Sequence, residues 1–327
     1  MKEITKKAIK ITLLSLLFSS ASALAKDYEI VNVVKVAGIP WFNQMEKGVS
    51  RAADVLHVHA RQLGPATPDP AQQVKIIEDL IAKGVDAITV VPNDVKVLEP
   101  VFKKAKEKGI VVLTHEAPDG HGADWDIETI DNQAYAKATM DELAHQMGGK
   151  GGYAIYVGSL TVPLHNNWAN LAIAYQKKAY PDMYEVTDRM PVAESIDASY
   201  AATNDLMKAH PDMKGIISYG SLGGIGAGQV IKKKRAKDKI AVVGIMMPGQ
   251  AAPYLMTGDI DKGFLWNPAD AGFALVAVAK DILDGKDISK GLDVPTLGKA
   301  EIDTQAKVIK FNKILEVDKS NATKLGF

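Results

Sequence analysis

The 327-residue sequence contains no cysteine. No disulfide can therefore brace the fold, and a lipid anchor attached to a cysteine behind a leader segment is excluded. Long apolar runs are also scarce: after residue 25, no stretch approaches the ~18 uninterrupted apolar residues of a membrane-spanning helix. An excess of one charge is lacking as well. Without residues 1–25, 35 basic residues face 38 acidic ones, and this net charge of about −3 does not favour nucleic acid as a partner.

Residues 1–25 have the three parts of a secretory leader. Four lysines precede an apolar core from Ile11 to Phe18, and Ala23-Leu24-Ala25 forms a small-x-small cleavage site. A buried N-terminal helix is the alternative interpretation, but such helices rarely combine all three parts. We therefore expect residues 1–25 to be a signal peptide, the mature chain to begin near Lys26, and the protein to work in the periplasm of a two-membrane bacterium.

Short, β-branched apolar runs alternate with amphipathic segments from Glu29 onward. Between the runs lie helical patterns such as 71–84, whose apolar residues recur on one face. Continuous apolar strands separated by single helices predict parallel sheets covered on both faces. The expected strands are 29–36, 58–63, 87–92, 110–116, 153–159, 184–190, 215–221, 240–246 and 261–266.

The alternation falls into two blocks, one ending near Thr129 and one beginning after Tyr135. The fold class we predict is α/β, with two doubly wound parallel-sheet lobes joined by hinge strands. The first lobe is expected to hold residues 26–131 plus 267–295, and the second 132–266 plus 296–327. The chain would cross between lobes at 131–132 and at 266–268. In such sheets ligands bind beyond the carboxyl ends of the strands, so two facing lobes predict a cleft that closes on a small molecule.

The segment after the first strand carries the strongest binding candidates. Trp41 and Phe42 are adjacent aromatics at a strand-to-helix turn, where flat apolar faces suit the C–H faces of a sugar ring. Packing between the lobe and its helix is their alternative role. Lys35 near the end of a buried strand needs a partner, because an unpaired buried ammonium is costly. That partner is a ligand or a carboxylate, and Glu116 could supply the carboxylate in the empty protein.

Further polar side chains recur at the other strand ends. Asn93 follows the third strand, and His115 and Glu116 end the fourth, where a carboxylate could accept from two neighbouring hydroxyl groups. Each of the remaining candidates could equally be a helix cap or a packing residue, and the case depends on their recurrence. The candidates in the second block are His165, Asn166, Ser221 and Asn267.

The sequence gives little support for a catalytic site or a metal-binding site. A zinc-binding helix would need a second histidine three residues after Glu116, but the next one, His121, follows Pro118. A sugar-processing enzyme would need paired carboxylates across a cleft, and Glu116 has no obvious acidic partner at a facing strand end. We therefore expect no catalytic residue, no metal site and no cofactor.

Several separated motifs resemble those of periplasmic sugar-binding proteins of bacterial ABC importers, in the autoinducer-2, rhamnose or simple-sugar subgroup. The motifs are Lys35 with GIPWFN, QQVKIIEDLIAKGVDAITVVPND, VVLTHE, VGSLTVPLHNNW and LWNPADAG. The resemblance covers nearly the whole mature chain. It implies the type I periplasmic binding fold, three crossings between the lobes, closure on the ligand, and delivery of the ligand to an inner-membrane ABC permease.

The same resemblance bears on the ligand. The autoinducer-2 receptors of the family use a lysine on the first strand, an Asp after the fourth, an Asp-Gln pair and a Pro-x-Ala segment. Here Lys35 matches, Glu116 stands in place of the Asp, and 164–165 and 219–221 depart from the pattern. Lost charge-assisted hydrogen bonds are worth roughly 1.5–3 kcal/mol each. We therefore expect a monomer that binds a small neutral sugar or polyol, with autoinducer-2 as the alternative ligand, for uptake or for signalling.

Overall fold

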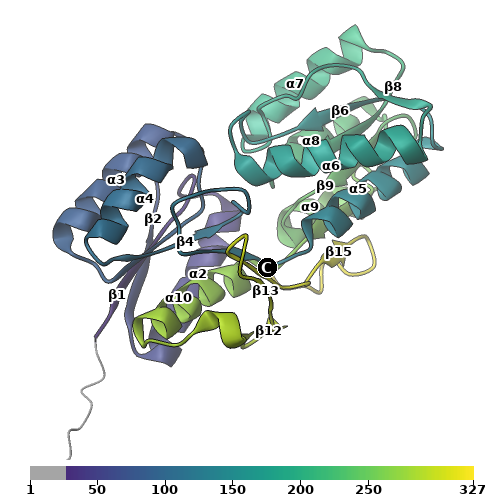
Figure 1. Ribbon diagram of the computed structural model, residues 1–327. Coiled ribbons are helices and arrows are strands. Elements are labelled where there is room, and N and C mark those ends of the chain that lie inside the picture. The colour runs from purple at the N-terminus through teal and green to yellow at the C-terminus, as the bar shows by residue number, and fades with distance from the viewer. Residues whose placement is uncertain (1–26) are drawn as a thin grey trace, which may run out of the picture.

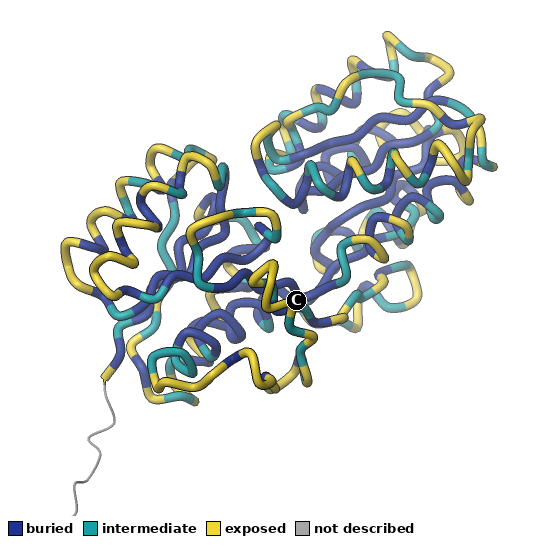
Figure 2. The backbone as a smooth tube through the Cα atoms, viewed as in Figure 1, coloured by how far each residue is buried: buried dark blue, intermediate teal, exposed yellow. Residues whose placement is uncertain are grey.

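The structure is a computed structural model that describes residues 27–327, so the expected signal peptide lies outside the described residues. The described chain forms two lobes, each with an open sheet between layers of helices (Figure 1). The predicted α/β class with two doubly wound, mainly parallel sheets is confirmed. Figure 2 shows the strands as the most deeply buried layer of each lobe, with exposure concentrated on the outer faces of the helices and in the loops.

The first lobe is built on a seven-stranded sheet in the order β13-β14-β5-β4-β3-β1-β2, parallel except where β13 pairs with β14. Helices α2 and α10 pack together on one face, and α3 and α4 on the other. The strands are β1 (Glu29–Val33), β2 (His59–Leu63), β3 (Ala87–Val90), β4 (Val111–His115), β5 (Trp125–Glu128), β13 (Glu301–Asp303) and β14 (Val308–Lys310). The helices are α2 (Pro40–Leu56), α3 (Pro70–Lys83), α4 (Val95–Glu107) and α10 (Pro268–Leu283).

The second lobe has a six-stranded sheet in the order β15-β10-β9-β8-β6-β7, in which only β15 runs antiparallel to its neighbour. Helices α5 and α6 pack together, as do α7 and α8, and α9 lies beside α8. The strands are β6 (Gly151–Tyr156), β7 (Met183–Glu185), β8 (Met213–Ser218), β9 (Ala241–Gly244), β10 (Lys262–Leu265) and β15 (Leu315–Val317). The helices are α5 (Asn132–Met147), α6 (Pro163–Ala179), α7 (Ile196–Ala209), α8 (Gly223–Lys234) and α9 (Pro248–Leu255). A small ribbon, β11 (Asp293–Val294) and β12 (Gly298–Lys299), follows the short helix η1 (Ile288–Lys290).

Local sequence explains why these elements begin and end where they do. Successive strand residues such as Ile30 and Val31 pack into cores on opposite faces of the sheet, and both are fully buried. Burial of one such side chain stabilises the fold by about 1.5–3 kcal/mol. The Asp94 carboxylate accepts from the Val97 backbone N–H and so caps the beginning of α4. Gly84 ends α3 with a left-handed φ of 73°, a conformation that glycine adopts without strain.

The chain crosses between the lobes three times. The first two crossings lie where they were predicted, between β5 and α5 and between β10 and α10, and Asp131 and Asn267 cap the helices that follow. The third connects β14 to β15 through residues 311–314. The expected boundary that gave all of 296–327 to the second lobe differs from this topology, because β13 and β14 extend the first sheet. These strands are short and partly exposed, so they lack a continuous apolar run.

Candidate functional site

Loops from both lobes meet at the carboxyl ends of the strands around a very small cavity. Its volume is about 10 Å³, room for roughly one water molecule, whereas ligand pockets usually measure about 300–1,000 Å³. The lobes are therefore closed on their own side chains, and a larger solute enters only after they separate. The lining residues are Lys35, Ile39, Trp41, Phe42, Glu116, His165, Glu194, Tyr219, Gly220, Ser221 and Ile245.

The ammonium group of Lys35 stands at the centre of the site. Its Nζ lies 2.9 Å from Glu116 Oε2 and 3.3 Å from Glu194 Oε1, and its side chain is 2% exposed. Burial alone would lower the pKa of Lys35, but the two carboxylates outweigh it and hold this pKa above its usual value. The lysine thus stays charged, and the predicted pairing of Lys35 with Glu116 is confirmed.

Glu194 is the site residue that the sequence analysis missed. It belongs to the second lobe, and its carboxylate lies against Gly158, where an added Cβ would be 2.8 Å from Glu194 Cδ. Among residues 27–327, nothing donates a hydrogen bond to its buried Oε2 atom. The inference that Glu116 has no acidic partner across the cleft is therefore wrong. Glu194 immediately precedes the helix cap Ser195 and lies nine residues beyond the end of β7, so a search of strand ends does not reach it.

The hydrogen bonds of His165 fix which ring nitrogen carries the proton. Burial and the charge of Lys35 lower its pKa well below the usual value, so the imidazole is neutral. The Gly158 backbone N–H donates to Nδ1 over 3.0 Å, which assigns the proton to Nε2. That atom faces Lys35 Nζ at 3.3 Å. Two donors thus point toward one another, an arrangement that an acceptor oxygen placed between them would satisfy.

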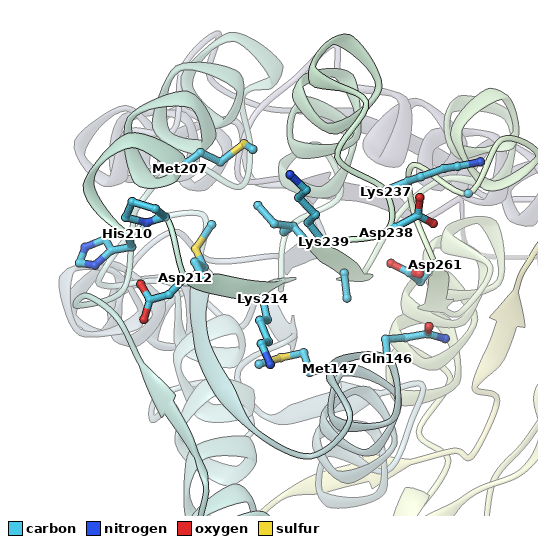
Figure 3. Close-up of a pocket in the computed structure, with 15 residues that line it drawn as sticks. Gln146, Met147, Met207, His210, Asp212, Lys214, Lys237, Asp238, Lys239 and Asp261 are labelled. Atoms are coloured by element: carbon cyan, nitrogen blue, oxygen red, sulfur yellow. The ribbon is translucent and has the colours of Figure 1, made fainter.

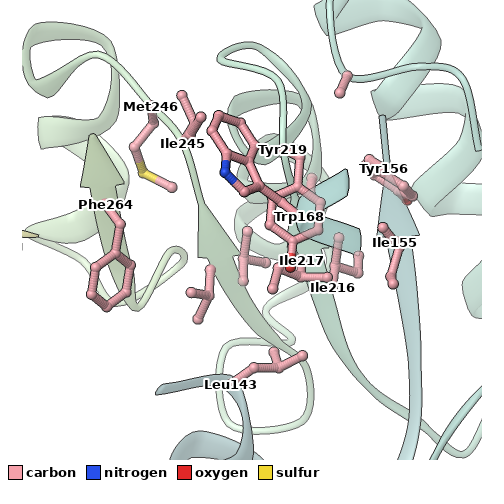
Figure 4. Close-up of a cluster of buried hydrophobic side chains, with 14 of the residues drawn as sticks. Leu143, Ile155, Tyr156, Trp168, Ile216, Ile217, Tyr219, Ile245, Met246 and Phe264 are labelled. Carbon is pink, nitrogen blue, oxygen red and sulfur yellow. The ribbon is translucent and has the colours of Figure 1, made fainter. Parts of the chain in front are cut away.

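Aromatic rings close the remaining sides of the site. Trp41 and Phe42 are both buried and both line the cavity. Trp41 contacts Trp266 edge to face, with ring centroids 5.0 Å apart. On the second lobe, Trp168 packs beside Tyr219 above strands β8 and β9, with centroids 5.9 Å apart (Figure 4). The two predicted aromatics are therefore placed where they could contact a ligand.

The other predicted residues divide into two groups. Ser221 lines the cavity, and Asn93 and His115 lie just behind it. Asn93 Nδ2 donates to the Lys35 carbonyl, and the His115 Nδ1 atom lies 2.6 Å from the Ile127 carbonyl. In contrast, Asn166 and Asn267 do not line the cavity. The Asn166 Nδ2 atom, in the first turn of α6, donates to backbone carbonyls of the preceding loop, and Asn267 Oδ1 caps α10.

Two buried carboxyl groups lie beside the first crossing. Burial raises the pKa of both Asp126 and Glu128, and the charge of Asp126 raises that of Glu128 further. Within the described part of the chain, Asp126 Oδ2 and Glu128 Oε1 lack a donor from another residue, so a proton held by Glu128 would serve both. Glu128 Oε2 accepts from Asn132, whose own Oδ1 accepts from Trp168 Nε1. This chain of contacts joins the two lobes across the hinge.

The rim of the closed cleft is held by two more contacts between lobes. The Thr161 hydroxyl donates to the Asn93 carbonyl at 3.3 Å, and Asn167 Nδ2 donates to Asp119 Oδ2 at 3.1 Å. Beside the first of these contacts, Val97 is 45% exposed on the first lobe and Leu160 is 64% exposed on the second. The rim therefore presents an apolar side chain from each lobe to solvent.

Three further features of the described residues concern metal binding, membrane crossing and a surface depression. Residues 27–327 hold no group of three or more His, Asp or Glu side chains arranged to bind a metal ion. None of the helices in that range is both long and apolar enough to cross a bilayer. A depression of about 910 Å³ lies in the second lobe, and its lining shares no residue with the cleft (Figure 3).

Comparison with known proteins gives a consistent result. The family model for the periplasmic binding protein domain matches residues 30–287. The chain is 24% identical to the ribose import binding protein of Bacillus subtilis over 283 residues, which are 84% of this chain and 88% of that protein. It is 28% identical over 227 residues to a xylitol-binding protein of Mycolicibacterium smegmatis, covering 68% of this chain and 63% of that one.

Solved structures agree on the fold. An ABC transporter solute-binding protein from Clostridium phytofermentas with bound L-rhamnose has a TM-score of 0.85 at 22% identity, covering 92% of this chain and 98% of that one. LsrB from Clostridium saccharobutylicum, in complex with AI-2, also has a TM-score of 0.85, at 19% identity, covering 91% of this chain and all of the other. At these identities the likeness establishes the shared two-lobed architecture.

Proposed function

Because this chain belongs to the periplasmic binding protein family, we propose that it captures a small sugar or polyol between its lobes. It releases that solute to an inner-membrane ABC permease and carries out no reaction on it. The observation that carries the proposal is the closed cleft itself, where charged and aromatic side chains of both lobes converge on one point. The leader in residues 1–25 supports a periplasmic location, and the mature protein acts as a monomer.

The side chains of the site suit hydroxyl groups. Lys35 and the Nε2–H of His165 donate, and the carboxylates of Glu116 and Glu194 accept. Hydrogen bonds to charged groups are the stronger ones, worth about 1.5–3 kcal/mol each. Trp41 and Phe42 supply apolar faces for the carbon skeleton. Relatives named for ribose and xylitol support a ligand of this class.

In this proposal, ligand binding is thermodynamically coupled to closure of the two lobes. Lys35 belongs to the first lobe and Glu194 to the second, so a ligand that hydrogen-bonds to both favours the closed arrangement over the open one. In the structure, Lys35 itself bridges the carboxylates of the two lobes. The ligand must replace this bridge, and the permease then meets a closed, loaded protein.

Autoinducer-2 is the second candidate ligand. The AI-2 complex of LsrB matches this chain with the same TM-score as the rhamnose complex, which is the observation in its favour. Leu164, His165 and the segment 219–221 depart from the residues that the resemblance assigns to autoinducer-2 recognition. A sugar or polyol is therefore the first choice.

A thermal-shift screen tests the proposal. Pentoses, hexoses, deoxysugars, polyols and autoinducer-2 are compared, since a ligand that binds only the folded state stabilises it by about 2.7 kcal/mol at one hundred times Kd. We expect one of these solutes to raise Tm by several degrees and to be recovered unchanged. If none raises Tm, or if the protein consumes the solute, the proposal is wrong.

The Trp41→Leu variant tests whether the ligand binds in the cavity between the lobes. It keeps an apolar side chain but removes the flat ring that lines the cavity, so we expect it to abolish most of the ligand-induced shift in Tm. Trp125→Leu is the matched control, because Trp125 is a buried tryptophan on β5 outside the cavity. An equal loss of the shift in both variants would place the ligand elsewhere.

A further inference from the structure

Positive charge is concentrated in one short segment of the second lobe. Residues 232–239 contain six basic residues and one acidic residue, although the chain from residue 26 onward is net negative. All of them except Ala236 are exposed. The ion pairs found between residues 27 and 327 include none of the six. Lys232 and Lys233 instead lie over the rings of Tyr254 and Tyr200, so the segment is left with uncompensated charge.

This segment borders the depression of about 910 Å³. Figure 3 shows Lys214, Lys237 and Lys239 around its rim. Lys214 comes from the beginning of β8, and Lys237 and Lys239 precede β9. The opposite ends of the same strands lead to the ligand cleft. A six-residue strand spans about 20 Å, so the depression and the cleft lie at opposite ends of the second lobe.

The acidic residues of the depression do not cancel this charge. Asp212 accepts from the Tyr184 hydroxyl, and Asp261 accepts from the Val242 backbone N–H. Burial raises the pKa of Asp261 to about 6, which reduces its negative charge in mildly acidic surroundings. Asp212 and Asp238 are exposed carboxylates, so with Asp261 three acidic residues of the depression stand against the six basic residues of the segment and Lys214. The surface therefore keeps a strong net positive charge.

We propose that this basic end, defined as Lys214, Lys232, Lys233, Lys234, Arg235, Lys237 and Lys239, docks the protein on an anionic phospholipid surface. The charges come from the end of α8, the loop before β9 and the start of β8, and three of them, Lys214, Lys237 and Lys239, line the open depression. Acidic peptide motifs are typically recognised by clusters of arginine, whereas six of these seven residues are lysines. Clusters of basic side chains are attracted to anionic headgroups over roughly one Debye length. The cleft, at the other end of the lobe, stays free to bind its solute.

Vesicle co-sedimentation tests the proposal. Protein expressed from the full chain is mixed with vesicles of phosphatidylcholine alone or with equal parts of phosphatidylglycerol. We expect binding to the anionic vesicles at 50 mM salt, at least tenfold weaker binding at 500 mM salt, and none to phosphatidylcholine. The triple variant Lys234→Glu, Lys237→Glu, Lys239→Glu should lose at least tenfold in vesicle binding.

A matched variant separates the basic end from net charge. Lys96→Glu, Lys103→Glu, Lys108→Glu changes the same number of exposed, unpaired lysines on the first lobe, and it should bind vesicles like the unaltered protein. Equal losses in both triple variants, or no binding to anionic vesicles at 50 mM salt, would overturn the proposal. Binding to polyglutamate without binding to vesicles would also overturn it, since that result assigns the surface to an acidic polypeptide.

Discussion

At the level of single residues, the carboxylate of Glu194 offers a direct test of the cleft. Glu194→Gln keeps the shape of the side chain and removes its charge, so hydrogen bonds worth about 1.5–3 kcal/mol become weaker. We expect the Kd of the bound sugar or polyol to rise at least tenfold in calorimetric titration. Asp197→Asn, an exposed carboxylate three residues further along, is the control and should leave Kd unchanged. An unaltered Kd for Glu194→Gln would remove this residue from the site.

Glu128 gives a prediction about pH. Its pKa in the folded state lies well above the ordinary value of 4.5, so the folded protein holds a proton that the unfolded chain releases. This group therefore makes the protein less stable as pH rises above about 4.5, by roughly 1.4 kcal/mol for each unit of pKa difference. Glu128→Gln supplies the same hydrogen bonds without titrating.

Thermal unfolding between pH 4.5 and 7.5 checks this prediction. The stability of Glu128→Gln relative to the unaltered protein should increase across that range. Glu99→Gln, a replacement on α4 away from the hinge, serves as the control for general effects of removing a carboxylate. A constant difference between Glu128→Gln and the unaltered protein would show that Glu128 is ionised in the folded state.

Individual residues also show which parts of the site could be predicted from the sequence alone. The Lys35–Glu116 pair was predictable because a buried ammonium needs a carboxylate and both residues follow buried strands whose carboxyl ends lie at the same edge of one sheet. Glu194 was overlooked because β7, the short strand preceding its loop, is partly exposed and gives a weak apolar signal. Asn166 and Asn267 were expected at the ligand because an amide suits hydroxyl groups, yet the Asn166 amide donates to backbone carbonyls and the Asn267 amide caps α10.

At the level of elements, α2 and α10 approach so closely that a side chain would not fit between them. A Cβ added to Gly48 would lie 1.8 Å from the Ala269 carbonyl oxygen, at the start of α10. Gly48→Ala should therefore destabilise the protein by about 1–3 kcal/mol or more, since overpacking shifts backbone. Thermal unfolding measures this, with the exposed Ser50→Ala on the same helix as control. Equal Tm values for the two variants would contradict the close packing.

Some helices and strands were easier to predict from their sequences than others. Capped amphipathic helices and continuous apolar strands were predictable from periodicity and caps, as α3 and β3 illustrate. Strand β5 was not, because Asp126 and Glu128 interrupt it, and a buried carboxyl pair in a strand contradicts the apolar pattern on which the prediction depends. Strands β13 and β14 were missed for a related reason, since their exposed charged residues resemble a loop.

At the scale of the whole molecule, Lys35 is the cation that lets carboxylates of opposite lobes approach each other. Lys35→Met leaves Glu116 and Glu194 facing one another without it, and removal of one partner from a buried ion pair costs about 3–5 kcal/mol. The lobes can escape this cost by separating. We therefore expect the empty variant to have a larger radius of gyration in small-angle X-ray scattering than the unaltered empty protein.

The double variant Lys35→Met, Glu194→Gln isolates the cause. It removes the repulsion between the Glu116 and Glu194 carboxylates while retaining the Lys35→Met substitution. Its radius of gyration should therefore return toward that of the unaltered protein. A double variant as expanded as Lys35→Met would mean that carboxylate repulsion does not set the angle between the lobes.

Because the chain contains no cysteine, the rim of the cleft can be labelled site-specifically with fluorophores to follow the opening of the lobes. Val97 and Leu160 are exposed on opposite lobes beside the Thr161–Asn93 contact. With thiols at both positions as the only two in the chain, a pair of fluorophores attached there would report the separation of the two halves in real time. Such a labelled protein would measure solute concentration without any enzyme or transporter present.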